Sequence, residues 1–134
     1  MDYWDAIDYI LDLPDMERFN AGPSAQTMSL ETMKALLARL GNPERGRRTI
    51  HITGSKGKGS TSTMIASILH ESGYRTGLYT SPHLHDYVER IAIDMLPVSR
   101  FDFADGIEEI RQAIDEVNQS EMGPVSTFGA MNAL

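Results

Sequence analysis

Glycine, lysine and hydroxyl residues gather in one short stretch, Ile50 to Thr63. Its three glycines can adopt backbone angles that let main-chain N–H groups approach an anion closely. Lys58 would add a full positive charge for the β- and γ-phosphates, and Ser60 or Thr61 a hydroxyl for Mg²⁺. The stretch therefore predicts a nucleotide phosphate cradle, and its candidate binding residues are Gly54, Ser55, Lys56, Gly57, Lys58, Gly59, Ser60 and Thr61.

The spacing of this stretch departs from the strict P-loop pattern, Gly-x4-Gly-Lys-Ser/Thr. Ile52 stands where the first glycine belongs, and Gly59 separates Lys58 from Ser60. The motif is thus a compressed variant. A glycine-rich turn can also be a purely structural connection between a strand and a helix. The lysine, the hydroxyl and the strand–loop–helix order together favour mononucleotide binding.

A strand before the loop and a helix after it would position these groups. Alternating residues over 49–53 predict the strand, and a helix should begin near Lys58 and end near Gly73. A second strand is expected over 75–80, so the unit reads as strand, helix and parallel strand with a right-handed crossover. Ligands of such sheets bind beyond the carboxyl ends of the strands. The expected buried face of the helix consists of Met64, Ile65, Ile68 and Leu69.

Helical periodicity recurs in the segments on either side. An N-terminal helix is expected from Asp2 to Leu13 and another around residues 29–41, with a loop between them. After the second strand, a loop leads to a short strand over 91–93, and Pro97 should close the turn that follows. Two further helices should begin at Ser99 and Ser126. The core face of the first of these consists of Phe103, Ile107, Ile110, Ile114 and Val117.

Composition restricts the class of protein. The length of 134 residues is typical of one domain, and 41% of the residues are hydrophobic. The formal net charge of −7 argues against general nucleic acid binding. The absence of cysteine excludes disulfides and thiolate chemistry. The acidic N-terminus is unlike a secretory signal, and no apolar run approaches the roughly 18 residues of a membrane span. We expect a cytoplasmic protein.

Five motifs in order resemble the N-terminal part of folylpolyglutamate synthase/dihydrofolate synthase, a branch of the Mur ligase superfamily. They are Tyr3-Trp4-Asp5-Ala6, Leu40-Gly41-Asn42-Pro43, the glycine loop, Tyr79-Thr80-Ser81-Pro82-His83-Leu84 and Glu89-Arg90-Ile91. The resemblance implies an α/β fold: a P-loop-like three-layer domain of the Mur ligase central-domain type, its mostly parallel sheet flanked by helices. The chain, residues 1–134, would be a truncated N-terminal part of this ATP-binding domain, without the C-terminal glutamate-ligase domain.

The resemblance also implies a reaction. Family members use ATP and Mg²⁺ to phosphorylate a carboxylate of folate or dihydropteroate, and the amino group of L-glutamate then displaces phosphate. Carried over by residue, Lys58 is catalytic, Ser60 and Ser81 hold the metal, and Thr80, Ser81, Pro82 and His83 bind substrate. The segments 25–28 and 81–85 are the candidate pterin loops. We expect a monomer with no nucleic acid or membrane partner, inactive as this segment alone.

The sequence leaves two alternatives open. A Mur-type ligase could act on another carboxylate, and a degenerate relative could bind ATP without transferring phosphate. The second is suggested by Gly129, which stands where the resemblance implies a glutamate that ligates Mg²⁺. Asp86 and Glu89 are candidate replacements for that ligand. Ser55-Lys56 in place of Thr-Asn and Met95 in place of a turn glycine are smaller departures.

The departure at position 129 generates a prediction. Restoring the carboxylate by Gly129→Glu should strengthen Mg²⁺ binding, because Mg²⁺ prefers hard oxygen ligands. A magnesium titration in the presence of nucleotide measures the change, and the isosteric but uncharged Gly129→Gln is the control. An unchanged titration would count against aligning this segment with the metal-binding one.

Overall fold

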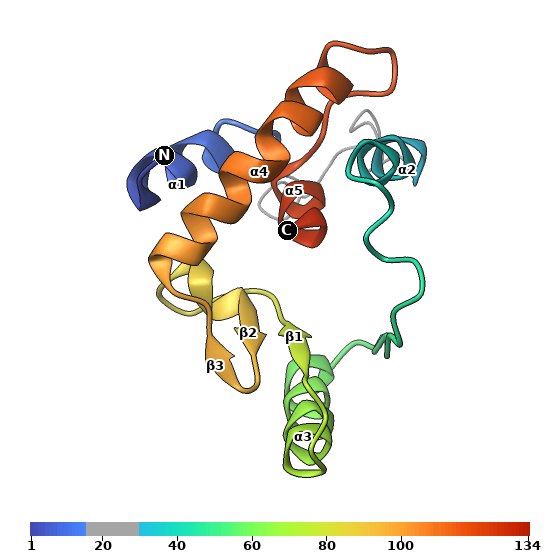
Figure 1. Cartoon of the computed structure of the whole chain (residues 1–134), viewed down its shortest axis with the longest axis vertical. Helices are drawn as coiled ribbons and strands as arrows, with labels where there is room; N and C mark the ends of the chain where they lie inside the picture. Colours follow the sequence, from blue (N-terminus) through green and yellow to red (C-terminus); the bar gives the residue numbers. More distant parts are fainter. Residues whose placement is uncertain (16–29) are drawn as a thin grey trace. The chain divides into compact units, whose positions relative to one another are not determined.

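A computed structural model describes residues 1–15 and 30–134 of the chain (Figure 1). The expected loop before residue 29, with the pterin-loop candidates 25–28 and the expected N-cap Ser29, lies outside these described residues. The described chain divides into two units. One comprises Met1–Arg47 with Ala104–Leu134, and the other Arg48–Phe103.

The first unit is helical. It contains α1 (Tyr3–Leu11), α2 (Leu30–Arg39), α5 (Thr127–Ala133) and most of α4 (Arg100–Asn118) (Figure 1). The sequence predicted each of these helices. Asp2 caps α1 as expected, because its carboxylate accepts hydrogen bonds from the N–H groups of Trp4 and Asp5. Ser126 caps α5 by accepting from the Gly129 N–H group.

The predicted apolar face of α4 forms the centre of this core. Every one of its five members is buried: Phe103, Ile107, Ile110, Ile114 and Val117. The start of α5 is fixed to the end of α1 by Thr127. Its hydroxyl donates to the carbonyl oxygens of Ile10 and Leu13 at 3.0 and 3.2 Å. Its N–H group donates to the carbonyl oxygen of Pro14 at 3.0 Å. The bond to Ile10 satisfies a carbonyl of the last turn of α1, and the other two fix the segment that follows the helix.

The second unit carries the glycine loop. Its elements are α3 (Lys58–Glu71), β1 (Gly77–Tyr79), the short 3-10 helix η1 (Tyr87–Arg90), β2 (Ile91–Ile93) and β3 (Leu96–Pro97). The strands form one antiparallel sheet in the order β1-β2-β3 (Figure 1). Leu78 lies opposite Ala92 in the first pair, and Ile93 opposite Leu96 in the second. Among the described residues, no helix is long and apolar enough to cross a bilayer.

The predicted parallel sheet is not confirmed. β1 and β2 form where strands were expected, but the strand over 49–53 was a wrong prediction, because this segment is irregular in the structure. A parallel strand is held by hydrogen bonds to a neighbour, and within the described part of the chain no strand lies beside it. Ile50 is consequently 59% exposed.

The buried face predicted for α3 is also wrong in part. Ile65 and Leu69 are half-buried, but Met64 and Ile68 are 59% and 65% exposed, and Ala66 is the buried residue of this helix. The periodicity correctly predicted a helix. The apolar side of a helix, however, can be buried only by an element that packs against it, and among the described elements β1 packs against part of α3.

A two-residue turn joins β2 to β3. Asp94 and Met95 both have positive φ, 49° and 68°, as a type I′ hairpin turn requires. Met95 therefore occupies a position that glycine would adopt without a steric penalty. Pro97, expected to close this turn, instead belongs to β3.

Two leucines of α2 differ in burial, so replacing each of them tests how much core packing contributes to stability. Leu36 is fully buried and Leu30 is 67% exposed. Leu36→Ala should lower the free energy of unfolding by about 2–5 kcal/mol, because it removes apolar contacts and leaves a cavity. Leu30→Ala, the matched control, should change it by less than about 0.5 kcal/mol. Urea unfolding followed by circular dichroism measures both, and equal effects would contradict this account of the core.

A substitution in the turn between β2 and β3 should raise the free energy of unfolding instead of lowering it. Met95→Gly should raise the free energy of unfolding by about 1 kcal/mol, because it relieves a left-handed conformation that costs other residues roughly 1–2 kcal/mol. Met64→Gly, at an exposed position within α3, should instead lower it by about 1 kcal/mol. Thermal unfolding of the two variants checks both signs. Destabilisation by Met95→Gly would show that the turn does not carry this strain.

Candidate nucleotide and substrate site

The glycine loop leads directly into the first turn of α3. Gly54 and Gly57 have φ values of 151° and 74°, which other residues rarely adopt. Gly57 is the N-cap of α3, and no side chain caps the helix there. A Cβ built on Gly57 or Gly59 would meet nothing within 4 Å. The first-turn N–H groups, which have no partner inside a helix, therefore border open space.

Lys58 lies over this loop. Its ammonium group donates a hydrogen bond to the Gly54 carbonyl oxygen at 2.8 Å, so the side chain bends back across the glycines. Positive charge is thus held beside the positive end of the helix dipole, an arrangement that favours an anion. Lys56 is exposed in the same loop.

The hydroxyl groups of α3 fall into two classes. Ser62 and Thr63 donate back to the carbonyl oxygens of Lys58 and Gly59, at 2.8 and 2.9 Å. Ser60 has no such bond to any described residue. That the Ser60 hydroxyl binds a ligand at the first turn stays a prediction.

The loop between β1 and η1 contains the predicted substrate-binding residues. Thr80 is fixed at its start by a hydrogen bond from its N–H group to the Arg90 carbonyl oxygen, 2.9 Å. Further along, Glu89 accepts hydrogen bonds from three consecutive N–H groups, those of Leu84, His85 and Asp86, at 2.9 to 3.0 Å. The bond from Leu84 is the main cause that lowers the pKa of the Glu89 carboxyl. The loop is therefore folded around its own carboxylate.

His83 is held by two residues of η1. Its Nδ1 atom accepts a hydrogen bond from the Nε–H of Arg90 at 2.9 Å. The ring of Tyr87 lies 4.2 Å from the His83 ring, and the guanidinium carbon of Arg90 lies 5.1 Å from the centre of the same tyrosine ring. Arg90 is 4% exposed and His83 is half-buried.

The candidate replacements for a metal carboxylate are engaged elsewhere. Glu89 holds the loop, and Asp86 pairs with the Arg100 guanidinium at 2.7 Å. Within the described residues, no group of three or more His, Asp or Glu side chains could hold a metal ion. The hydroxyl oxygens of Ser60 and Ser81 are of the hard donor type that Mg²⁺ accepts, and their role as metal ligands stays a prediction.

Gly129 belongs to the helical unit, whereas the glycine loop belongs to the other unit. It is a buried residue near the start of α5, and its N–H group donates to the Ser126 hydroxyl at 3.1 Å. A Cβ at this position would lie 3.4 Å from that hydroxyl and 3.5 Å from Val125, which is ordinary contact. Among the described residues, there is therefore room for a Cβ at this position.

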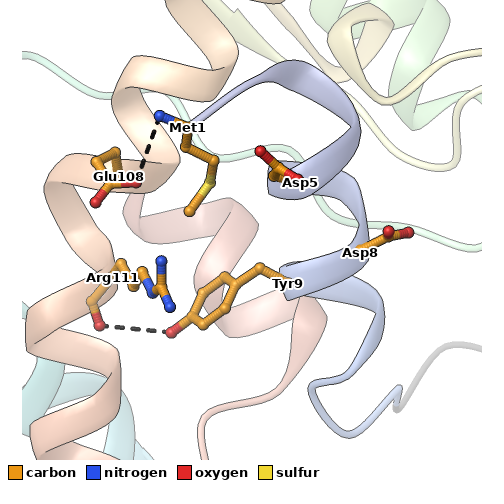
Figure 2. Close-up of a pocket in the computed structure, with 6 residues that line it drawn as sticks. All are labelled: Met1, Asp5, Asp8, Tyr9, Glu108 and Arg111. Carbon is orange, nitrogen blue, oxygen red and sulfur yellow. Dashed lines mark hydrogen bonds and ion pairs between the residues drawn. The ribbon is translucent and has the colours of Figure 1, made fainter.

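An open pocket of about 530 Å³ lies in the helical unit, and none of its residues was predicted (Figure 2). Tyr9 points from α1 toward α4, where its hydroxyl donates to Asp115 at 2.8 Å and its ring lies 5.2 Å from the Arg111 guanidinium carbon. Burial and the bond to Asp115 raise the pKa of Tyr9. Because these groups bond one another, we interpret them as a polar seam between helices. The lining residues are Met1, Asp5, Asp8, Tyr9, Glu108 and Arg111.

The structure places two predicted clusters in one unit. The glycine loop and the segment Thr80–His83 both belong to the unit 48–103. The supporting roles of Tyr87, Glu89 and Arg90 were not predicted. The spacing Asp86-x-x-Glu89 offered one signal, since it matches the capping-box pattern in which the acid reaches back to a preceding N–H group.

Comparison with known proteins gives consistent relatives, although no family model matches the chain. The chain is 38% identical over 104 residues to the dihydrofolate synthase/folylpolyglutamate synthase of Bacillus subtilis, covering 78% of this chain and 24% of that protein. It is 35% identical over 121 residues to the folylpolyglutamate synthase of Lacticaseibacillus casei, covering 90% and 26%. The chain thus spans about a quarter of these relatives.

Solved structures agree with the sequence relatives. A folylpolyglutamate synthase complex with AMPPCP and folate superposes with a TM-score of 0.85 at 33% identity, over 99% of this chain and 31% of that one. The Thermotoga maritima folylpolyglutamate synthase gives a TM-score of 0.83 at 33% identity, over 98% and 28%. The fold of the chain is therefore that of the matching part of these enzymes. On sequence and structure together, the chain belongs to the folylpolyglutamate synthase/dihydrofolate synthase family.

Proposed function

We propose that this chain is the nucleotide-binding part of an amide ligase that uses ATP and Mg²⁺ to join L-glutamate to a carboxylate of folate or dihydropteroate. The observation that carries the proposal is the uncapped first turn of α3, which borders open space under Lys58. The reaction would pass through an acyl phosphate that the glutamate amine attacks. Such phosphoryl transfer needs positioning and charge neutralisation more than covalent chemistry from the protein.

Relatives supply the substrate class. One neighbour is described as bound to AMPPCP and folate, and another as bound to AMPPCP. AMPPCP is an analogue of ATP, so these ligands match the nucleotide and the pterin of the proposed reaction. The name of the Bacillus subtilis relative includes dihydrofolate synthase, which keeps dihydropteroate open as the substrate.

Each predicted residue has a role in the proposal. The N–H groups of residues 57–60 would bind the phosphates, and Lys58 would stabilise the charge on the transferred group. Ser60 and Ser81 would hold Mg²⁺, which when bound would neutralise the phosphate oxygens. The segment Thr80–His83 would contact the pteroate part of the substrate.

The rest of the catalytic apparatus would come from further polypeptide. The chain covers about a quarter of its relatives' length, and a C-terminal domain would supply the glutamate site. The exposed apolar side chains of Met64 and Ile68 also support this proposal, because they offer α3 a face for additional structure. The monomeric state and cytoplasmic location stay predictions.

A non-catalytic nucleotide-binding relative is the second candidate. It is favoured by Gly129 in place of an expected metal-binding glutamate, and by the engagement of Asp86 and Glu89 in other bonds. A ligase for a different carboxylate is the third. Both would retain the glycine loop, so nucleotide binding alone does not distinguish them from the proposed enzyme.

Release of ADP and phosphate that depends on glutamate tests the proposal. The natural protein that contains this chain is assayed with dihydropteroate, with tetrahydrofolate and without a pterin. Turnover that requires both the pterin and glutamate supports the proposed enzyme. Tight binding of ATP without turnover would support the non-catalytic relative, and turnover with another carboxylate would support the third candidate.

Replacing Lys58 tests the proposed phosphate role most directly. Lys58→Ala should lower turnover by more than about tenfold, because it removes the charge placed at the phosphates. The fold should persist, since the side chain is exposed and its ammonium group bonds to Gly54 within the loop. Lys34→Ala, an exposed lysine paired with Glu31 in the other unit, is the control and should leave turnover unchanged. Activity that survives Lys58→Ala would show that the phosphate role is misassigned.

A further inference from the structure

The loop after β1 is held at both ends by two neighbouring residues. At its start, the N–H group of Thr80 donates to the Arg90 carbonyl oxygen at 2.9 Å. At its far end, the N–H groups of residues 84–86 donate to the Glu89 carboxylate. Between these two points lies the segment Thr80–His83, which contains the predicted substrate-binding residues. The path of this segment is therefore fixed from both sides by the last two residues of η1.

Glu89 uses both of its carboxylate oxygens for the loop. Oε2 accepts the N–H group of Leu84 at 2.9 Å, and Oε1 accepts those of His85 and Asp86 at 3.0 and 2.9 Å. Bonds to a charged acceptor are stronger than bonds to a neutral one. A glutamine side chain has one acceptor oxygen and an amide nitrogen that can only donate. Glutamine at position 89 therefore cannot replace both carboxylate oxygens.

Burial of the loop's own side chains does not explain its order. Leu84 is 86% exposed, and the side chain of His85 is 89% exposed. Side chains that stay in water contribute little apolar burial to hold a backbone in place. Asp86 adds one tie to the start of α4, through its ion pair with Arg100 at 2.7 Å. The backbone bonds to Glu89, and not the burial of Leu84 and His85, therefore order this end of the loop.

We propose that Glu89 is a positioning residue for substrate binding, whose carboxylate holds the far end of the loop so that the segment Thr80–His83 meets the pteroate substrate already ordered. This inference rests on the proposed function, which supplies the substrate and the role of that segment. A loop that is ordered in advance loses less conformational entropy when the substrate binds, which raises the affinity. Glu89 acts through the loop backbone and not by contact with the substrate.

Amide hydrogen exchange, measured by NMR on the natural protein that contains this chain, tests the anchoring. The amides of residues 84–86 should exchange at least about tenfold more slowly than those of an unstructured peptide. Glu89→Gln should speed the exchange of at least one of these amides about tenfold, and Glu89→Ala that of all three. Wild-type amides that exchange as fast as those of a peptide would overturn the inference.

Steady-state kinetics test whether the anchoring serves substrate binding. Glu89→Gln should raise the KM for the pteroate substrate about tenfold, because the loop must then be ordered during binding. The KM for L-glutamate should stay unchanged, since the proposal places its site in further polypeptide. A general loss of folded protein would instead lower the apparent kcat and leave both KM values unchanged. Glu71→Gln, at an exposed glutamate that ends α3 in the same unit, is the control and should leave both KM values unchanged.

Two outcomes would contradict the positioning role while glutamate ligation itself stands. An unchanged KM for the pteroate substrate in Glu89→Gln, with faster exchange of amides 84–86, would show that order in this loop does not serve binding. A raised KM with unchanged exchange would show that Glu89 does not act through the loop. If the wild-type protein shows no ligation with dihydropteroate or tetrahydrofolate, the proposed function fails, and the substrate role of the loop fails with it. The exchange experiment then still decides whether Glu89 holds the loop.

Discussion

The unpaired N–H groups at the start of α3 are the constraint on which the functional interpretation depends. A helix leaves its first-turn donors without internal partners, and most helices satisfy them with a capping side chain. Gly57 has no side chain with which to cap α3, while Asp2 and Ser126 cap α1 and α5 in the same chain. The start of α3 therefore lacks the side-chain cap that α1 and α5 have, at the place where the sequence puts Lys56 and Lys58.

The loop after β1 shows the opposite design. Its polar backbone is satisfied internally, by the carboxylate of Glu89 and the carbonyl of Arg90. Carboxylates that accept several N–H groups form strong, charge-assisted bonds. A fold that leaves donors unsatisfied in one loop and satisfies them in the next separates two tasks. The first loop suits an incoming anion, and the second suits a substrate that meets prearranged side chains.

The second unit also has features of an incomplete layer. Its sheet has three short antiparallel strands, and segment 49–53 is irregular although its sequence alternates. Met64 and Ile68 expose a face that the periodicity of α3 would bury. Parallel strands and the helices that cover them are mutually dependent, because neither can bury its apolar side alone. These exposures are consistent with a chain that spans about a quarter of its relatives' length.

The sequence by itself determined what depends on local chemistry: the capped helices, the apolar face of α4, the glycines that permit the loop, and Lys58 beside them. These follow from periodicity and from backbone angles, which neighbouring residues set. Tertiary structure decided what depends on distant partners. Ile50 and Met64 stay mostly exposed because no described strand or helix covers them. Glu89 becomes a loop anchor, and His83 accepts a hydrogen bond from Arg90. A hydrogen bond between side chains depends on the folded path of the chain, so no periodicity in the sequence reveals it.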